Sequence, residues 1–306
     1  MKAKLIKIVG GIALGVALLV LALPTIVHKA GLHPEYNGEA VQLPAGKRAL
    51  IIATNQAVLS APGETTGDAT GVMASEMTHP YYRFLDAGMQ VDLASIKGGK
   101  IPVDPQTINW LLKTPEDDRF LADPAFLAKV ENSMRIDDVD FTQYDIIFMA
   151  GGFGAAYDLG YSPVLAEKIS EAYYASNEPV IGGVCHGVLG LINAKDRDGK
   201  SLIAGRRMTG VTDKQIKELG IIEITPQHPE TELRKAGVIF ESNTRFMDFL
   251  ATLVVVDDEE RFVTGQNQNS GRETAHRMLE LVASKSTKYA ALLSIASQSA
   301  SKQSDQ

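Results

Sequence analysis

The only cysteine of this 306-residue chain, Cys185, lies in a segment with the features of a strained catalytic turn. The apolar run Pro179–Val184 precedes it and predicts a buried strand, and a helix is expected to begin at His186. A nucleophile elbow strains its central residue, and small neighbours such as Gly183 and Gly187 permit this. A helix N-terminus would favour the thiolate, which is the nucleophile. The segment predicts a reactive thiol; the alternative is that Cys185 is a small buried hydrophobic residue.

A second pair of glycines could supply hydrogen-bond donors to the same chemistry. Gly151 and Gly152 follow the predicted strand Ile146–Ala150, so the backbone there can approach the elbow closely. The N–H groups of this turn and of His186 are placed to hold an oxyanion. A single cysteine cannot form an intrachain disulfide, and no Cys/His cluster has the spacing of a zinc site. We therefore expect no metal, so that any chemistry at Cys185 comes from its thiol.

The N-terminus has the composition of a membrane segment. Lys2, Lys4 and Lys7 precede a long apolar run, Ile8–Val27, whose only helix breaker is Pro24. At about 1.5 Å per residue this run spans roughly 30 Å, the thickness of a bilayer core. The lysines predict a cytoplasmic N-terminus, with the rest of the chain on the periplasmic or extracellular face. Because the run is long for a signal peptide and no A-x-A site follows, we favour an anchor over a signal peptide whose cleavage would give a secreted protein.

The rest of the chain divides into a linker, one folded domain and a polar tail, after a membrane segment at residues 1–27. Proline and glycine in residues 28–46 indicate a linker. Residues 47–284 alternate apolar runs with amphipathic stretches, the pattern of β-α-β units with a mainly parallel sheet. Within them, four prolines divide residues 97–143 into short pieces, which predicts a helical insertion over the strand ends. Residues 285–306 are too polar to hold a place in a core, so we expect a disordered tail.

The apolar runs of the domain define its expected elements. The expected strands are Ala49–Ala53, Gln90–Ala94, Ile146–Ala150, Val180–Val184, Thr252–Val256 and Arg261–Thr264. The expected helices are Ser75–Ala87, Ser162–Ser176, His186–Asn193 and Gly271–Val282. Right-handed crossover connections make a doubly wound α/β sandwich, with helices on both faces of the sheet, the economical topology. A net charge of −7 without a basic stripe argues against a nucleic-acid partner.

Five motifs together resemble the DJ-1/PfpI superfamily, and within it the Hsp31-like branch with a type 1 glutamine amidotransferase-like domain. They are GGVCHG at 182–187, AGGFG at 150–154, GVMASEMTHPYYRFLDAGMQVDLAS at 71–95, FLADPAF at 120–126 and TGQN at 264–267. The motifs occur in the family's order over about residues 47–282. The resemblance implies a flavodoxin-like fold of the class I glutamine amidotransferase type.

The resemblance also implies roles for individual residues. Cys185 would be the nucleophile, His186 its neighbour, and Glu76 the acid that hydrogen-bonds the thiol from the start of a helix. A carboxyl group in that position can exchange a proton with the sulfur and with a small carbonyl substrate. Without the resemblance, Glu76 would be one more glutamate on a helix surface.

The chain departs from the family pattern beside this group of residues. Phe153 stands where the family turn usually has histidine, which alters the wall of the oxyanion site. Ile216 aligns with the glutamate that orients the histidine in the family, and an isoleucine cannot fix an imidazole tautomer. Asp213 or Glu218 could substitute after a loop shift, the alternative being that both are solvated charges. His228 is a further pocket candidate, the alternative being a surface histidine.

These residues leave three functions open. The first is a glyoxalase III-like lyase that needs no cofactor, in which Cys185 adds to methylglyoxal and Glu76 moves a proton between the two carbons. The second is a cysteine hydrolase or amidase of the PfpI type with His186 as base, which the isoleucine at 216 disfavours. The third is a non-enzymatic holdase chaperone or redox sensor. A thiol outside the cytoplasm meets oxidising conditions, which fits a role in stress defence. A homodimer is left open.

Overall fold

A mainly parallel sheet forms the centre of the molecule. The computed structural model describes residues 2–304 and the side chains of residues 7–289. Seven strands lie in the order β10-β11-β7-β6-β1-β4-β5, and only the β10–β11 pair is antiparallel. The bounds of these strands are β1 Arg48–Ala53, β4 Gln90–Ser95, β5 Met134–Arg135, β6 Ile146–Met149, β7 Val180–Val184, β10 Val254–Val256 and β11 Phe262–Gly265. The doubly wound, mainly parallel sheet expected from the sequence is confirmed.

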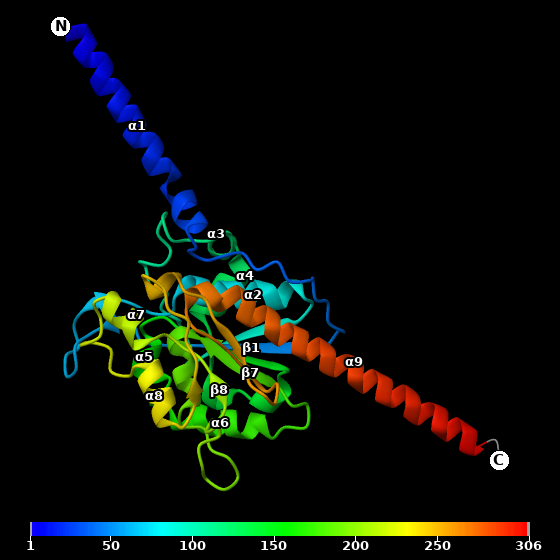
Figure 1. The fold of residues 1–306 in the computed structure, drawn as a ribbon. Helices are drawn as coiled ribbons and strands as arrows, with labels where there is room; N and C mark the ends of the chain where they lie inside the picture. The colour runs from blue at the N-terminus through cyan, green and yellow to red at the C-terminus, as the bar shows by residue number, and fades with distance from the viewer. Residues whose placement is uncertain (1, 305–306) are drawn as a thin grey trace.

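Helices and two small two-stranded sheets, β2-β3 and β8-β9, complete the fold (Figure 1). The α-helices are α1 Lys2–Lys29, α2 Ala74–Asp86, α3 Pro115–Leu121, α4 Pro124–Glu131, α5 Ala155–Asp158, α6 Pro163–Tyr173, α7 Asp213–Glu218, α8 Pro229–Lys235 and α9 Gly271–Ser304. The 3-10 helices are η1 Ile136–Asp138, η2 Phe141–Gln143, η3 Cys185–Leu191, η4 Asp248–Leu250 and η5 Gln268–Ser270. The short strands are β2 Val58–Leu59, β3 Asp68–Ala69, β8 Arg207–Met208 and β9 Ile239–Phe240.

The central strand β1 contributes to a hydrophobic core on each face of the sheet. Ala49, Ile51 and Ala53 belong to one buried cluster, whereas Leu50 and Ile52 belong to the other. This division follows from the two-residue period of a strand, which turns successive side chains to opposite faces. The whole of β1 after its first residue is buried, so it reads in the sequence as a continuous apolar run.

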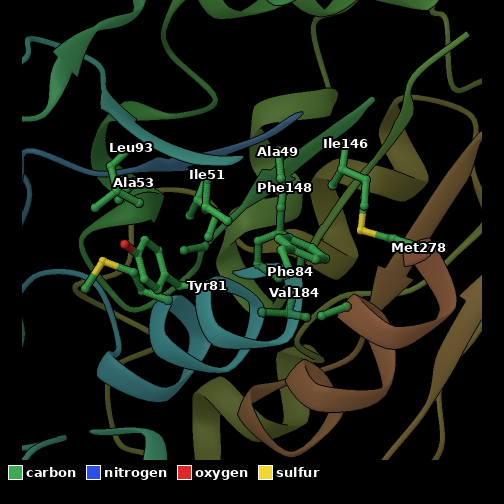
Figure 2. Close-up of a cluster of buried hydrophobic side chains, with 14 of the residues drawn as sticks. Ala49, Ile51, Ala53, Tyr81, Phe84, Leu93, Ile146, Phe148, Val184 and Met278 are labelled. Carbon is green, nitrogen blue, oxygen red and sulfur yellow. The ribbon is translucent and has the colours of Figure 1, made fainter. Parts of the chain in front are cut away.

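The two faces are covered by different helices. Tyr81 and Phe84 of α2 and Met278 of α9 pack in the first cluster, which Figure 2 shows. Leu165 and Ile169 of α6 pack in the second cluster, together with residues of η3. Helices on both faces agree with the fold class predicted from the sequence, and the two cores fix the β6 and β7 strand ends that carry the functional turns.

The two ends of the chain differ from the expected organisation. The apolar N-terminal run forms α1, and residues 7–29 are long and apolar enough to cross a membrane, with no buried residue in the most apolar stretch. The expected linker at 28–46 begins with residues that are part of the folded domain, since Leu32 and His33 are buried. At the other end α9 continues through the expected disordered tail as far as Ser304, because alanine, lysine and glutamine favour helix. Residues 305–306 of that tail lie outside the described residues.

The segment expected to be an insertion has the predicted character. Residues 97–143 contain α3, α4 and two 3-10 turns, with prolines at the first position of both α-helices. Thr114 and Asp123 cap these two helices by accepting backbone N–H hydrogen bonds. The segment also adds the edge strand β5, which the sequence did not predict because two residues carry no periodic signal.

Candidate active site

Cys185 lies at a sharp turn between β7 and η3 with a left-handed backbone. Its φ of 56° is in the region that residues other than glycine rarely occupy, which confirms the strained elbow expected from the sequence. A side chain at Gly183 or Gly187 would collide with the carbonyl of Met149 on the neighbouring strand. These glycines therefore let β6 and the elbow approach each other closely.

Glu76 in the first turn of α2 points into the protein beside this elbow. Its side chain is fully buried, and neither carboxyl oxygen has a well-formed hydrogen bond within the described part of the chain. One carboxyl oxygen lies where a side chain at Gly151 would be, so the glycine provides the space for it. Burial raises the pKa of the carboxyl from 4.5 to about 8, although nearby groups, the Cys185 thiol and the N–H groups of Gly151 and Gly152, favour ionisation. At neutral pH Glu76 is therefore mainly a carboxylic acid.

The thiol of Cys185 is also neutral in the resting site. Burial and the charge of the nearby Glu76 carboxylate raise the pKa of the thiol well above its usual value. The sequence analysis predicted that a helix N-terminus would favour the thiolate, and this prediction is wrong. The helix that follows is a seven-residue 3-10 helix, and burial and the facing Glu76 carboxyl raise the pKa of the thiol. The sulfur and the carboxyl form a pair in which each group opposes ionisation of the other.

Backbone donors meet the sulfur from two turns. The N–H groups of His186 and Gly152 both favour the thiolate form of Cys185, so both lie close to the sulfur. Gly152 has a φ of 100°, and a side chain there would collide with the backbone at Met73. The two turns predicted to supply N–H groups are thus brought together at the thiol.

His186 contacts the sulfur but has no acidic partner. Its Nδ1 lies 3.4 Å from the Cys185 sulfur, while its Nε2 has no hydrogen-bond partner among the described residues. Burial, and to a lesser extent His228, lowers the pKa of the imidazole to about 3, so the ring is neutral at physiological pH. The Phe153 ring meets the imidazole edge to face at 5.9 Å between centroids. The phenylalanine that replaces the family histidine is therefore a wall of the site.

The acid that would orient His186 is replaced by apolar packing. Ile216 on α7 is completely buried in the hydrophobic cluster next to α2. Asp213 accepts a hydrogen bond of 2.7 Å from the Thr231 hydroxyl, and Glu218 accepts one of 2.8 Å from the backbone N–H of Asp248. Neither is hydrogen-bonded to His186 in the described structure, so neither substitutes for the missing acid.

His228 lies at the edge of this region with its own partner. Its Nε2 is 3.0 Å from the carbonyl oxygen of Ile222, and the side chain is half-buried. It is near enough to His186 to affect the pKa of that imidazole, but it does not line the cavity at Cys185. The structure thus places it behind the site.

A cavity of about 480 Å³ opens at Cys185 and His186. Its walls are mostly apolar, and they include residues for which the sequence gave no functional signal. These are Leu111 and Leu112 of the insertion, Leu219, Phe249 and Leu250 near α7 and η4, and Val27, Ala30, Leu32 and His33 at the end of α1. Within the described residues, no group of three or more His, Cys, Asp or Glu side chains is placed to bind a metal.

Comparisons with known proteins identify relatives of this chain. The sequence model described as the DJ-1/PfpI family matches residues 68–281. The glutathione-independent glyoxalase HSP31 of Saccharomyces cerevisiae is 30% identical, over 70% of this chain and 90% of its own length. The glutathione-independent glyoxalase hsp3101 of Schizosaccharomyces pombe is 29% identical, over 70% of this chain and 88% of its own length.

Solved structures show the same fold. The Rapid Encystment Protein 24 kDa of Francisella tularensis has 31% identity and a TM-score of 0.69, and the match covers 77% of this chain and 99% of that one. Glyoxalase III of Candida albicans has 25% identity and a TM-score of 0.68, over 77% of this chain and 97% of that one. The parts of this chain outside the family match include the apolar helix α1 and the end of α9.

Proposed function

Because the chain belongs to the DJ-1/PfpI family, we propose that it is a cysteine-dependent glyoxalase that converts 2-oxoaldehydes such as methylglyoxal to hydroxy acids. Its relatives with this activity in their names match most of the chain. The observation that carries the proposal is the buried pair of Cys185 and Glu76, in which a carboxyl with a pKa near 8 stands beside the nucleophile. Such a group can both accept and donate a proton near neutral pH.

The proposed reaction starts with addition of the thiol to the aldehyde. The ionised fraction of Glu76, about a tenth at pH 7, accepts the thiol proton as the sulfur bonds to the aldehyde carbon. The carbonyl oxygen receives that proton, and a hemithioacetal results. The N–H groups of Gly152 and His186 stabilise the negative oxygen before it is protonated.

Two further steps complete the proposed conversion. Glu76 removes the proton from the carbon bonded to sulfur and returns it to the adjacent carbon, while the hydroxyl proton moves to the other oxygen. The product is a thioester, which water hydrolyses to the hydroxy acid and the free thiol. One substrate and one water thus give one hydroxy acid, and no glutathione, metal or redox partner enters the balance.

The hydrolase alternative draws less support from the site. An amidase would need His186 as base, and its lowered pKa and unpartnered Nε2 leave it a poor one. Spoiling the orientation of such a histidine costs about 10⁴ in rate in related triads.

We further propose that α1 anchors the enzyme with its domain outside the cytoplasm, as a defence against reactive carbonyls. The support is the length and apolar character of residues 7–29 and the lysines before them. A signal peptide would pass the same test, and the mass of the mature chain in a membrane fraction separates the two.

The enzymatic proposal is tested with a Cys185→Ser variant. The intact protein should convert methylglyoxal to lactate without glutathione, and Cys185→Ser should reduce kcat by more than about 10³, because the serine hydroxyl is a far weaker nucleophile. Chiral chromatography of the lactate gives the measurement. Equal rates for the two proteins would reject the proposed chemistry.

A further inference from the structure

The wall of the Cys185 cavity includes the end of the membrane helix. Val27 and Ala30 at the C-terminal end of α1, and Leu32 and His33 just after it, line the same cavity as Cys185 and His186. This segment lies before the family match, which begins at residue 68. The active-site cavity and the membrane segment are therefore adjacent in space, as Figure 1 shows for α1 and the domain below it.

Hydrogen bonds fix this segment to the domain. The Asn269 side chain accepts a hydrogen bond of 2.7 Å from the His33 N–H and donates one of 2.8 Å to the Gly31 carbonyl. Arg272, almost fully buried, donates to the His33 carbonyl at 2.7 Å and forms an ion pair of 2.7 Å with Glu116. Because Asn269 and Arg272 lie at η5 and the start of α9, the helix end is tied to the domain core, not suspended on a linker.

The face around the cavity mouth carries exposed apolar side chains. Trp110 is 54% exposed beside the cavity residues Leu111 and Leu112, and Leu219 is 41% exposed on the cavity wall itself. Exposed tryptophan next to a membrane span is typical of the bilayer interface. If α1 spans the bilayer, its last turn lies at the interface, and the cavity opens there.

The size and lining of the cavity exceed what methylglyoxal needs. Cavities of about 300–1,000 Å³ hold drug-sized ligands, whereas methylglyoxal carries only a methyl group beside its two carbonyls. The lining includes the apolar side chains of Leu112, Leu219 and Leu250. Contact with an alkyl chain would remove their surface from water and so favour binding.

We propose that the substrates are 2-oxoaldehydes with an apolar chain that enter the Cys185 cavity from the lipid bilayer past the end of α1. The proposal rests on the proposed glyoxalase function and names its substrate class. The reaction at the two carbonyl carbons is unchanged, and the chain lies along Leu112 and Leu219 toward the helix end.

A substrate series tests the chain preference. The full-length protein in vesicles should show kcat/KM rising about threefold to fourfold for each added methylene, up to the capacity of the cavity. Leu112→Gln should lower kcat/KM for a long-chain 2-oxoaldehyde about tenfold more than for methylglyoxal, because it places an amide in the chain's path. Leu85→Gln is the control, since Leu85 is a solvent-accessible leucine on α2 outside the cavity, and should change neither value.

Trp110 allows a test that does not depend on turnover. It is the only tryptophan, so its fluorescence reports one position. In vesicles of phosphatidylcholine brominated near the head group, this fluorescence should be strongly quenched. In a Trp110→Phe protein carrying Tyr174→Trp at the end of α6, away from the cavity, quenching should be absent.

The outcomes separate the two proposals. Turnover of methylglyoxal with no chain-length dependence, or unquenched Trp110, overturns the membrane substrate and leaves the glyoxalase function standing. No turnover of any 2-oxoaldehyde overturns the glyoxalase function and the substrate class together, even with quenched Trp110.

Discussion

Two ionisable side chains, Glu76 and His186, lie next to the sulfur of Cys185, and their surroundings differ. On the side of α2, Glu76 is buried without well-formed hydrogen bonds, and its pKa is raised into the neutral range. On the side of η3 and α7, His186 keeps its contact with the sulfur, but the place of its orienting acid is filled by Ile216.

This contrast teaches which group is prepared for proton transfer. A fully buried carboxyl without good partners destabilises the folded chain, so it is retained at a cost to stability that a catalytic role would explain. The neutral imidazole of His186, with one unpartnered nitrogen, is a poor base, although it can still line the cavity. The carboxyl side should therefore carry the chemistry, and five predictions test that difference.

The largest effect is expected for Glu76→Gln. The amide keeps the shape of the side chain but cannot exchange a proton, so kcat for methylglyoxal should fall by about 10²–10⁴. Steady-state kinetics with the purified full-length protein gives the measurement. Glu171→Gln, which changes an exposed carboxyl on α6 outside the cavity, is the control for the same substitution elsewhere. A fall of less than tenfold would remove Glu76 from the mechanism.

The second prediction concerns pH. If the carboxylate of Glu76 is the base, kcat/KM should rise about tenfold per unit from pH 6 and level off near pH 8, the pKa of this carboxyl. The Glu76→Gln protein should lose this rise. A wild-type profile already flat between pH 6 and 8 would mean that another group accepts the proton.

The free energy of unfolding should fall as pH rises, whereas kcat/KM should increase. The folded state holds the Glu76 proton more tightly than the unfolded chain, so the stability that this proton brings is present below pH 4.5 and is lost as pH rises toward about 8. Glu76→Gln should therefore stabilise the domain at pH 8 by about 2–4 kcal/mol, and by less at pH 5. Thermal unfolding at the two values checks this sign.

A smaller effect is expected on the imidazole side. His186→Gln should reduce kcat by less than about tenfold, since a neutral, unoriented ring contributes little of the 10²–10⁴ that a positioned base supplies. The comparison is made at pH 7 beside Glu76→Gln. If His186→Gln loses as much kcat as Glu76→Gln, the imidazole contributes as much to catalysis as the carboxyl, which would contradict the prediction.

The smallest effect is expected for the two acids near α7. Asp213→Asn and Glu218→Gln should leave kcat/KM and its pH dependence unchanged, because their partners are Thr231 and the Asp248 backbone and not His186. Their thermal stability is measured with the activity. A selective loss of kcat in either variant would show that the loop reaches His186 when substrate binds.

The sequence pattern predicted the strands and the elbow because these depend on residues close together in the chain. The β7 strand, Val180–Val184, matches the expected range. The glycines around Cys185 indicated a strained turn, and Cys185 has a left-handed backbone. The position of Glu76 at the sulfur followed only from the resemblance to a family, since nothing in its own helix distinguishes it from a surface glutamate.

Other features could not be predicted from local patterns. Leu32 and His33 lie in a stretch with the composition of a linker, yet contacts with Asn269 and Arg272 bury them. The predicted direction of the Cys185 pKa shift was also wrong, since the local sequence indicates a helix N-terminus but not the burial that raises the pKa of the thiol.

The sequence by itself determined the order of the main elements, the apolar N-terminal helix and the sharp turn at Cys185. Only the tertiary structure decided that the helix end forms a wall of the Cys185 cavity, and that the thiol and Glu76 are both neutral. The physical reason is that backbone conformation depends on neighbouring residues, whereas burial and the energy of a charge depend on groups brought together from distant parts of the chain.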